Sequence, residues 1–220
     1  MTRLLRVAMV CTVVAAGLVS TAKFAEAALI LDQSQGTTLP PPAFGGPIRN
    51  DFIDIAQTFT VGLGGILGRV EVALSRLVDT AGPLNVEIRS TIAGLPDPLS
   101  ASVVAEGVLT AADVPNGPQF AFVGVDLLSE NFVVAPGDVL AIVLRSDTTA
   151  GGYFWAFTPG DPYAGGHGFF RNHTPGTEPF LIGGGDHFFR TFVAPVAEPA
   201  STALIVFGLA MLGFARRRVL

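Results

Sequence analysis

The sequence has almost no cysteine and almost no lysine. Its only cysteine, Cys11, and its only lysine, Lys23, both lie in the N-terminal segment. The rest of the chain therefore contains no disulfide and no cysteine ligand for a metal. A domain without disulfides relies on its own hydrophobic core, and the 220 residues are enough for one domain of ordinary size with terminal segments added.

Positive charge is also scarce between residues 28 and 198. This region has seven arginines against 17 acidic residues, a net charge of −10, because the other six basic residues lie at the two ends of the chain. A domain with this charge repels nucleic acid and anionic lipid. Nucleic acid is therefore excluded as a partner.

The usual catalytic motifs are absent. The sequence contains no Gly-x-Ser-x-Gly, no His-Glu-x-x-His and no phosphate-binding loop. Paired carboxylates for glycoside hydrolysis come together only on folding, so the sequence leaves that chemistry open. We therefore predict a non-enzymatic protein, and the alternative is an extracellular carbohydrate-active hydrolase or lyase.

The central region shows no sustained helical period. Short apolar or alternating runs are separated instead by turn signals such as Gly64-Gly65 and Pro136-Gly137-Asp138. The predicted strands cover 55–61, 67–74, 84–89, 120–127, 132–138 leading into 139–145, 153–157, 168–171 and 187–193. Many short strands between turns predict an all-β, antiparallel β-sandwich domain over 28–194, and a jelly roll is the more specific expectation.

The N-terminus has the organisation of a secretory signal peptide. Arg3 and Arg6 precede an apolar run from Val7 to Val19, and small residues follow at Ala25 and Ala27. A basic start, a short apolar run and a small-x-small site are what export and signal peptidase require. We predict a signal peptide over 1–27, cut after Ala27. An uncleaved anchor is the alternative, although the apolar run is short for a membrane span.

The C-terminal segment, 195–220, has three parts in a fixed order. A short motif is followed by an apolar run over 203–215 and then by a basic cluster two residues before the end. The motif contains Glu198, Pro199, Ala200 and Ser201, and the cluster contains Arg216, Arg217 and Arg218. An apolar helix with arginines on one side is held in the inner membrane with those arginines in the cytoplasm.

This tail resembles the PEP-CTERM family of sorting signals, with Ala197 in place of the first proline of the motif. The resemblance implies cutting by an exosortase and release to the cell surface or extracellular matrix of a Gram-negative bacterium that makes exopolysaccharide. A plain C-terminal membrane anchor is the alternative. The pieces 57–61, 86–89 and 136–144 are similar to the β-sandwich domains fused to such tails, and these in turn are similar to jelly-roll carbohydrate-binding modules. The resemblance therefore implies exopolysaccharide as a partner.

Aromatic residues gather after residue 150. Sugar-binding sites stack the apolar faces of sugar rings on exposed aromatic rings, and polar neighbours bond the hydroxyl groups. The predicted ligand-binding residues are Tyr153, Trp155, Asp161, Tyr163 and Arg171, with Asn172 as a further polar neighbour. The alternative is that these rings fill the sandwich core, because Tyr153, Trp155 and Phe157 share one face of a strand.

All three histidines also lie late in the chain. His167, His173 and His187 are near Asp161, Glu178 and Asp186 in sequence, and imidazole with carboxylate is suited to metal binding or acid–base chemistry. Their spacing matches no known metal motif, and scattered loop histidines are the alternative. Calcium as a structural ion is a separate expectation, because an acidic loop such as that of Asp161 offers oxygen ligands. No other cofactor is expected.

Overall fold

The computed structural model describes residues 28–36, 48–49, 53–172 and 178–196. The predicted signal peptide, and the motif, apolar run and arginine cluster of the tail, lie outside these residues. Within the described part, no helix is long and apolar enough to cross a membrane.

The described chain is built from short strands and three single-turn 3₁₀ helices. The strands are β1 (Ile30–Gln35), β2 (Ile53–Thr60), β3 (Gly65–Arg76), β4 (Leu84–Ile92), β5 (Leu95–Pro96), β6 (Val103–Leu109), β7 (Ala121–Asp126), β8 (Val133–Val134), β9 (Val139–Arg145), β10 (Tyr153–Trp155), β11 (Phe157–Pro159), β12 (Gly168–Asn172), β13 (Leu181–Ile182), β14 (Gly185–His187) and β15 (Phe189–Ala194). The helices are η1 (Ser100–Ser102), η2 (Ala111–Asp113) and η3 (Leu128–Glu130).

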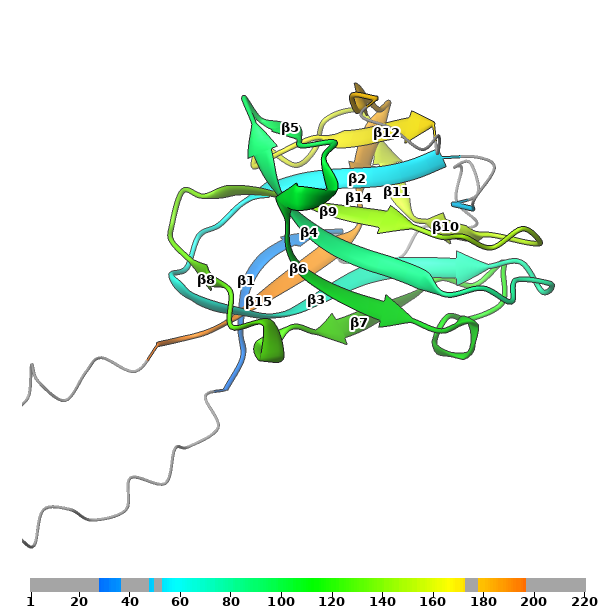
Figure 1. Cartoon of the computed structure of the whole chain (residues 1–220), viewed down its shortest axis with the longest axis horizontal. Coiled ribbons are helices and arrows are strands. Elements are labelled where there is room, and N and C mark those ends of the chain that lie inside the picture. The colour runs from blue at the N-terminus through cyan, green and yellow to red at the C-terminus, as the bar shows by residue number, and fades with distance from the viewer. Residues whose placement is uncertain (1–27, 37–47, 50–52, 173–177, 197–220) are drawn as a thin grey trace, which may run out of the picture.

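The strands form two antiparallel sheets that face each other like the layers of a sandwich (Figure 1). The first sheet has the order β1-β15-β3-β7, with β8 beside the start of β3 and β10 beside its end. The second has the order β13-β12-β2-β9-β4-β6, with the short β5 also pairing with β4. A separate two-stranded ribbon pairs β11, which follows β10 in the chain, with β14, which precedes β15.

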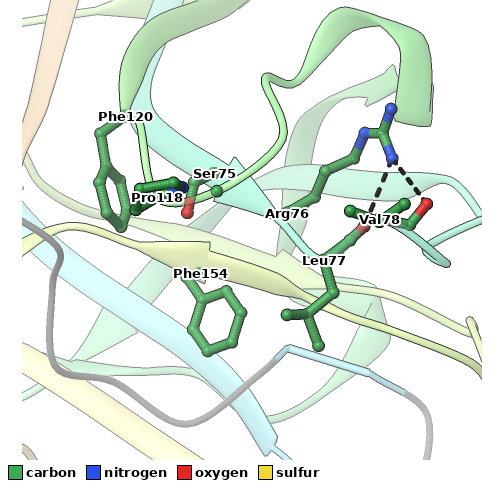
Figure 2. Close-up of a pocket in the computed structure, with 8 residues that line it drawn as sticks. Ser75, Arg76, Leu77, Val78, Pro118, Phe120 and Phe154 are labelled. Carbon is green, nitrogen blue, oxygen red and sulfur yellow. Dashed lines mark hydrogen bonds between the residues drawn. The ribbon is translucent and has the colours of Figure 1, made fainter.

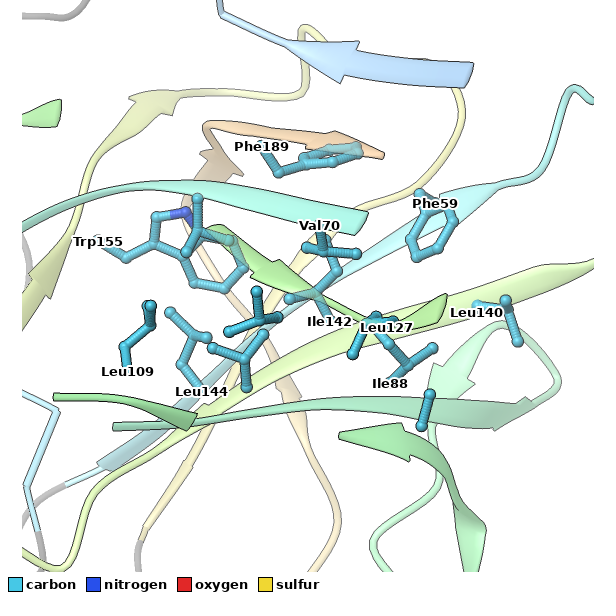
Figure 3. Close-up of a cluster of buried hydrophobic side chains, with 14 of the residues drawn as sticks. Phe59, Val70, Ile88, Leu109, Leu127, Leu140, Ile142, Leu144, Trp155 and Phe189 are labelled. Atoms are coloured by element: carbon cyan, nitrogen blue, oxygen red, sulfur yellow. The ribbon is translucent and has the colours of Figure 1, made fainter. Parts of the chain in front are cut away.

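The core lies between the two sheets and is formed by alternate residues of their strands. Val70, Val72 and Leu74 of β3 face Ile88 of β4 and Ile142 of β9, and all five side chains are almost completely buried. Figure 3 shows Val70, Ile88 and Ile142 together with Phe59, Trp155 and Phe189. Because successive side chains of a strand point to opposite faces, Glu71, Ala73 and Ser75 lie on the outer face of the first sheet, away from this core.

The turns follow the chemistry of their residues. Gly137 has a φ of +93°, and the Asp138 carboxylate accepts a 2.8 Å hydrogen bond from the Ala135 N–H, which closes the predicted Pro136-Gly137-Asp138 turn. The β4–β5 hairpin turns at Ala93 and Gly94, both with positive φ. A two-residue turn of this kind matches the right-handed twist of the strands.

The all-β, antiparallel prediction is confirmed, with three differences in detail. The predicted strand 153–157 is two strands, because Ala156 leaves β10 and the chain then joins the ribbon as β11. The predicted strand 187–193 divides in the same way at Phe188, between β14 and β15. Strands β1 and β6, and the two-residue strands β5 and β13, were not predicted.

Candidate functional site

The three aromatic residues predicted to bind a sugar are buried. Tyr153 and Trp155 have 0% and 1% of their surface exposed, and Tyr163 has 8%. The Trp155 Nε1–H donates to the Phe188 carbonyl oxygen at 2.8 Å, and the Tyr153 hydroxyl donates to the Gly82 carbonyl oxygen. Burial raises the pKa of Tyr163 to about 12. This corrects the prediction of an exposed platform, because a sugar ring cannot stack on covered rings.

Arg171, the predicted polar partner, is also buried. Its Nε donates to the Asp54 carboxylate at 2.9 Å, and its guanidinium lies 4.5 Å from the centre of the Phe180 ring. A further hydrogen bond goes to the Pro98 carbonyl oxygen at 3.1 Å. Arg171 therefore holds the 96–102 loop and Phe180 against β2 and β12. Asp161, the other predicted polar partner, is exposed.

Arg171 is one end of a row of charges across the outer face of the second sheet. Asp54 on β2 contacts both Arg171 and Arg145, and Arg145 lies 3.6 Å from Glu87 on β4. Glu87 accepts a 2.7 Å hydrogen bond from Arg89 Nε, and Arg89 Nη1 also donates to three carbonyl oxygens of the 96–102 loop. Opposite charges alternate across neighbouring strands, which is a stabilising arrangement.

Two carboxylates meet on this face, as a glycoside hydrolase would require. Glu87 and Glu106 are direct partners in the β4–β6 pair and line one polar pocket of about 390 Å³. The two Glu87 oxygens, however, are occupied by ion pairs with Arg89 and Arg145. Of these two carboxylates, Glu106 is the exposed one, and it makes no ion pair within the part of the chain that the structure describes. We call Arg171, Asp54, Arg145, Glu87 and Arg89 the charge row. Because Glu87 is part of this row, the Glu87 and Glu106 pair is poorly suited to act as the acid and nucleophile of a hydrolase.

A group of three aromatic side chains lies on the outer face of the first sheet. Phe122 pairs directly with Ala73, and Phe154 pairs directly with Ser75, so both share the outward face of β3. Phe120 lies two residues before Phe122 and points the same way. All three phenylalanines are partly exposed. We call Phe120, Phe122 and Phe154 the outer aromatic face.

A pocket of about 300 Å³ opens beside this face, at the end of β3. Figure 2 shows Phe120 and Phe154 on its wall, with Pro118 and Leu77 close by. The Arg76 guanidinium is turned to backbone carbonyl oxygens, including those of Leu77 and Val78, and so supports the rim of the pocket. The lining is mostly apolar, as in small-ligand and sugar sites.

Charged groups border the outer aromatic face along the sheet. The Arg190 guanidinium lies 3.9 Å from the centre of the Phe122 ring and 3.5 Å from the Glu71 carboxylate. Arg69 pairs with Asp126 at 2.8 Å in the next row. These groups offer donors and acceptors beside the rings. The Glu71 and Arg69 side chains lie over Gly124, where a Cβ atom would be 2.8 Å from Glu71 Cγ and 3.0 Å from Arg69 Nη2.

A second cluster contains three of the residues predicted to bind a metal. Asp161, His167 and Asp186 offer ligand atoms that all lie within 4.8 Å of one another. His187 does not join them: it is buried, stacked on Trp155 at 4.6 Å between ring centres, and burial lowers its pKa to about 3. Glu178 is exposed outside this group, and His173 lies outside the described residues.

The sequence carries a signal for the outer aromatic face. Phe120 and Phe122 are two residues apart in a strand pattern, so they share one face. Phe154 lies between Tyr153 and Trp155 and must point opposite to both. Which of the two faces lies outside could not be read from this pattern, because both faces carry aromatic residues.

No protein-family model matches this chain, and the searches of curated proteins and of solved structures found no significant match either.

Proposed function

We propose that this protein is exported, sorted by an exosortase and presented at the cell surface or in the extracellular matrix as a non-enzymatic polysaccharide-binding domain. The observation that carries the binding part is the outer aromatic face with its adjoining pocket, where partly exposed phenylalanine rings meet an apolar cavity. Sugar rings present apolar C–H faces that stack on such rings.

The strand order supports a jelly roll for this domain. The eight main strands are, in chain order, β1, β2, β3, β4, β6, β7, β9 and β15. Numbered this way, the first sheet runs 1-8-3-6 and the second 2-7-4-5, and β12 extends the second sheet beside β2. Two interleaved four-stranded sheets of this order arise when one long hairpin is folded over, which is the jelly-roll arrangement.

The positions of β1 and β15, the first and last strands of the described domain, are consistent with a domain attached through its C-terminal segment. Ile30 of β1 pairs with Val193 of β15, which in turn pairs with Leu67 near the start of β3 (Figure 1). The pocket lies at the other end of β3, beside Ser75 and Arg76. A strand of this length spans about 35 Å. A domain held by its C-terminal segment would therefore present the pocket away from the attachment point.

The sorting part is tested by the intact mass of the protein recovered from the native cell surface and medium. We expect a species that begins at Ala28 and ends near Glu198. A species that retains Arg216, Arg217 and Arg218 would leave only a membrane anchor and would remove the exosortase from the proposal.

The binding part is tested with exopolysaccharide purified from the producing cells. Replacing Phe120 and Phe154 with alanine should weaken binding roughly tenfold or more, because each aromatic contact is worth about 1 kcal/mol. Phe170→Ala is the matched control, since Phe170 is an exposed phenylalanine on β12 in the other sheet. Equal binding by the double variant and the control would contradict the proposal.

The hydrolase alternative has one observation in its favour, the Glu87 and Glu106 pair in the polar pocket. A hydrolase would release new reducing ends from the same polysaccharide, and Glu106→Gln would abolish that release. We expect no release by either protein, because Arg89 and Arg145 occupy the Glu87 carboxylate.

A further inference from the structure

The geometry points to a binding site for a divalent transition-metal ion formed by Asp161, His167 and Asp186. The three residues come from separate parts of the chain: the loop after β11, the segment before β12, and β14. His167 Nδ1 lies 3.0 Å from Asp161 Oδ1, and the ligand atoms of all three lie within 4.8 Å of one another. This site lies apart from the outer aromatic face and does not depend on the proposed function.

Asp186 gives the strongest reason to expect a cation here. Its surface is only 1% exposed, and each carboxylate oxygen accepts one hydrogen bond, from Gln57 Nε2 at 3.2 Å and from the Tyr163 N–H at 2.9 Å. Within the part of the chain that the structure describes, no arginine pairs with this carboxylate. Buried charges in proteins are either paired or coordinate a metal, so the missing counter-charge calls for a cation.

The backbone around the cluster is fixed in place before any ion binds. The His167 N–H donates to Thr58 Oγ1 at 2.9 Å, and the His167 carbonyl oxygen accepts from the Thr58 N–H at 2.9 Å. The Gly160 N–H donates to the Gly184 carbonyl oxygen at 3.0 Å, which joins the Asp161 loop to the segment that leads to Asp186. Each ligand is therefore anchored to a neighbouring strand by its own main chain or by that of an adjacent residue.

Glycines let these segments approach closely and leave room for the ion. A Cβ atom at Gly168 would lie 2.1 Å from the Gly185 carbonyl oxygen, and one at Gly185 would lie 2.2 Å from the Thr158 carbonyl oxygen. A pocket of about 410 Å³ opens over the three ligands and is lined mainly by glycines. Solvent can therefore reach the ligand atoms from one side, which gives an ion a way in.

The ligand chemistry selects the class of ion. One imidazole nitrogen with two carboxylate oxygens suits Zn²⁺ and similar transition ions, whereas Ca²⁺ takes oxygen ligands alone. Neighbouring ligands of a tetrahedral Zn²⁺ lie about 3.3 Å apart, close to the 3.0 Å between His167 and Asp161. Both of these side chains are more than half exposed and can rotate toward the fixed Asp186. Three protein ligands leave a fourth position for water or an external oxygen.

The competing interpretation is a simple ion pair between Asp161 and a protonated His167. The test is equilibrium dialysis of the full-length chain, purified in mild detergent through a tag without histidines and stripped with a chelator, against ZnCl₂. We expect one Zn²⁺ per chain. His167→Gln and Asp161→Asn should each weaken Zn²⁺ binding at least tenfold, and both exposed changes should leave the fold intact.

Glu178→Gln is the matched control, because Glu178 is an exposed carboxylate in the same region outside the cluster. This variant should bind Zn²⁺ like the unchanged chain. X-ray absorption at the zinc edge should show an imidazole ligand that His167→Gln removes. No saturable uptake of Zn²⁺, uptake unchanged in both cluster variants, or displacement of Zn²⁺ by an equal concentration of Ca²⁺ would each overturn the site.

Discussion

The two sheets have outer faces of opposite character. The outer face of the first sheet carries Phe120, Phe122 and Phe154, which are partly exposed and adjoin an open pocket. The outer face of the second carries the charge row that includes Asp54 and Arg171, which are buried under the 96–102 loop and Phe180.

This contrast reverses the usual association of polar residues with function and apolar residues with stability. On the second sheet, Arg89 and Arg171 donate hydrogen bonds to the 96–102 loop, so their guanidinium groups are not available to a ligand. On the first sheet, Phe120, Phe122 and Phe154 are partly exposed, so they remain accessible to the proposed ligand.

The largest loss of folding stability is expected when the charge row is broken. Arg89→Ala removes the nearer of the two arginines that pair with the buried Glu87, together with three hydrogen bonds to the 96–102 loop. Removing one partner of a buried ion pair costs about 3–5 kcal/mol, so the free energy of unfolding, measured in urea, should fall by that amount.

Arg69→Ala is the control on the other face. Arg69 pairs with Glu71 and with the largely exposed Asp126, and exposed pairs contribute at most about 1 kcal/mol. Similar losses of stability in the two variants would mean that the charge row is no more structural than a surface ion pair.

A smaller loss is expected from the predicted site residue that proved to be core. Trp155→Phe removes the hydrogen bond to the Phe188 carbonyl oxygen and leaves a small cavity. The free energy of unfolding should fall by about 2 kcal/mol, while polysaccharide binding stays unchanged. Weaker polysaccharide binding by a Trp155→Phe variant that remains folded would show that Trp155 belongs to the binding site.

The next effect is a pH dependence that originates at His187. Burial lowers its pKa from 6.5 to about 3, so below pH 6.5 the unfolded chain takes up a proton that the folded domain does not. Stability should therefore fall by about 1 kcal/mol for each pH unit below 6.5 and should not depend on this group above 6.5. His187→Phe should remove this slope between pH 6.5 and 5. An unchanged slope would place the titrating group elsewhere.

The smallest effect on stability is expected at the outer aromatic face. Phe154 is only partly buried, so Phe154→Ala should lower the free energy of unfolding by about 1 kcal/mol. The same variant should weaken polysaccharide binding about fivefold. A loss of stability as large as that of Arg89→Ala would show that the ring is a core residue.

Most of the strands could be predicted because their local pattern agrees with their final position. The runs over 67–74 and 84–89 alternate, and the structure has β3 and β4 there. Strand β6 contains Gly107, whose missing side chain makes room for Val125 of β7, and this need appears only in the packed structure. Strand β1 is an edge strand defined by its pairing with β15, 158 residues away, and local sequence does not encode that pairing.

The candidate sites were less predictable. The alternation of 153–157 separated Tyr153 and Trp155 from Phe154, but only the packing of the two sheets decides which set is covered. The sequence offers six acidic and histidine residues in this region. The pairing of β11 with β14 places Asp161 and Asp186 near each other and near His167, and of the other described residues, Glu178 and His187 do not join them. Neither result follows from spacing, because both depend on contacts between segments distant in the sequence.

The proposed binding surface is tested most directly by mapping where the exopolysaccharide contacts the domain. Backbone amide chemical shifts should be recorded by NMR for the isotope-labelled protein with and without purified exopolysaccharide. If the proposal is right, the shifts change around residues 75–78, 117–122 and 154, on the outer aromatic face and in its adjoining pocket. Changes around Glu87, Glu106 and Arg145 instead would contradict it and would place the ligand on the charged face of the second sheet.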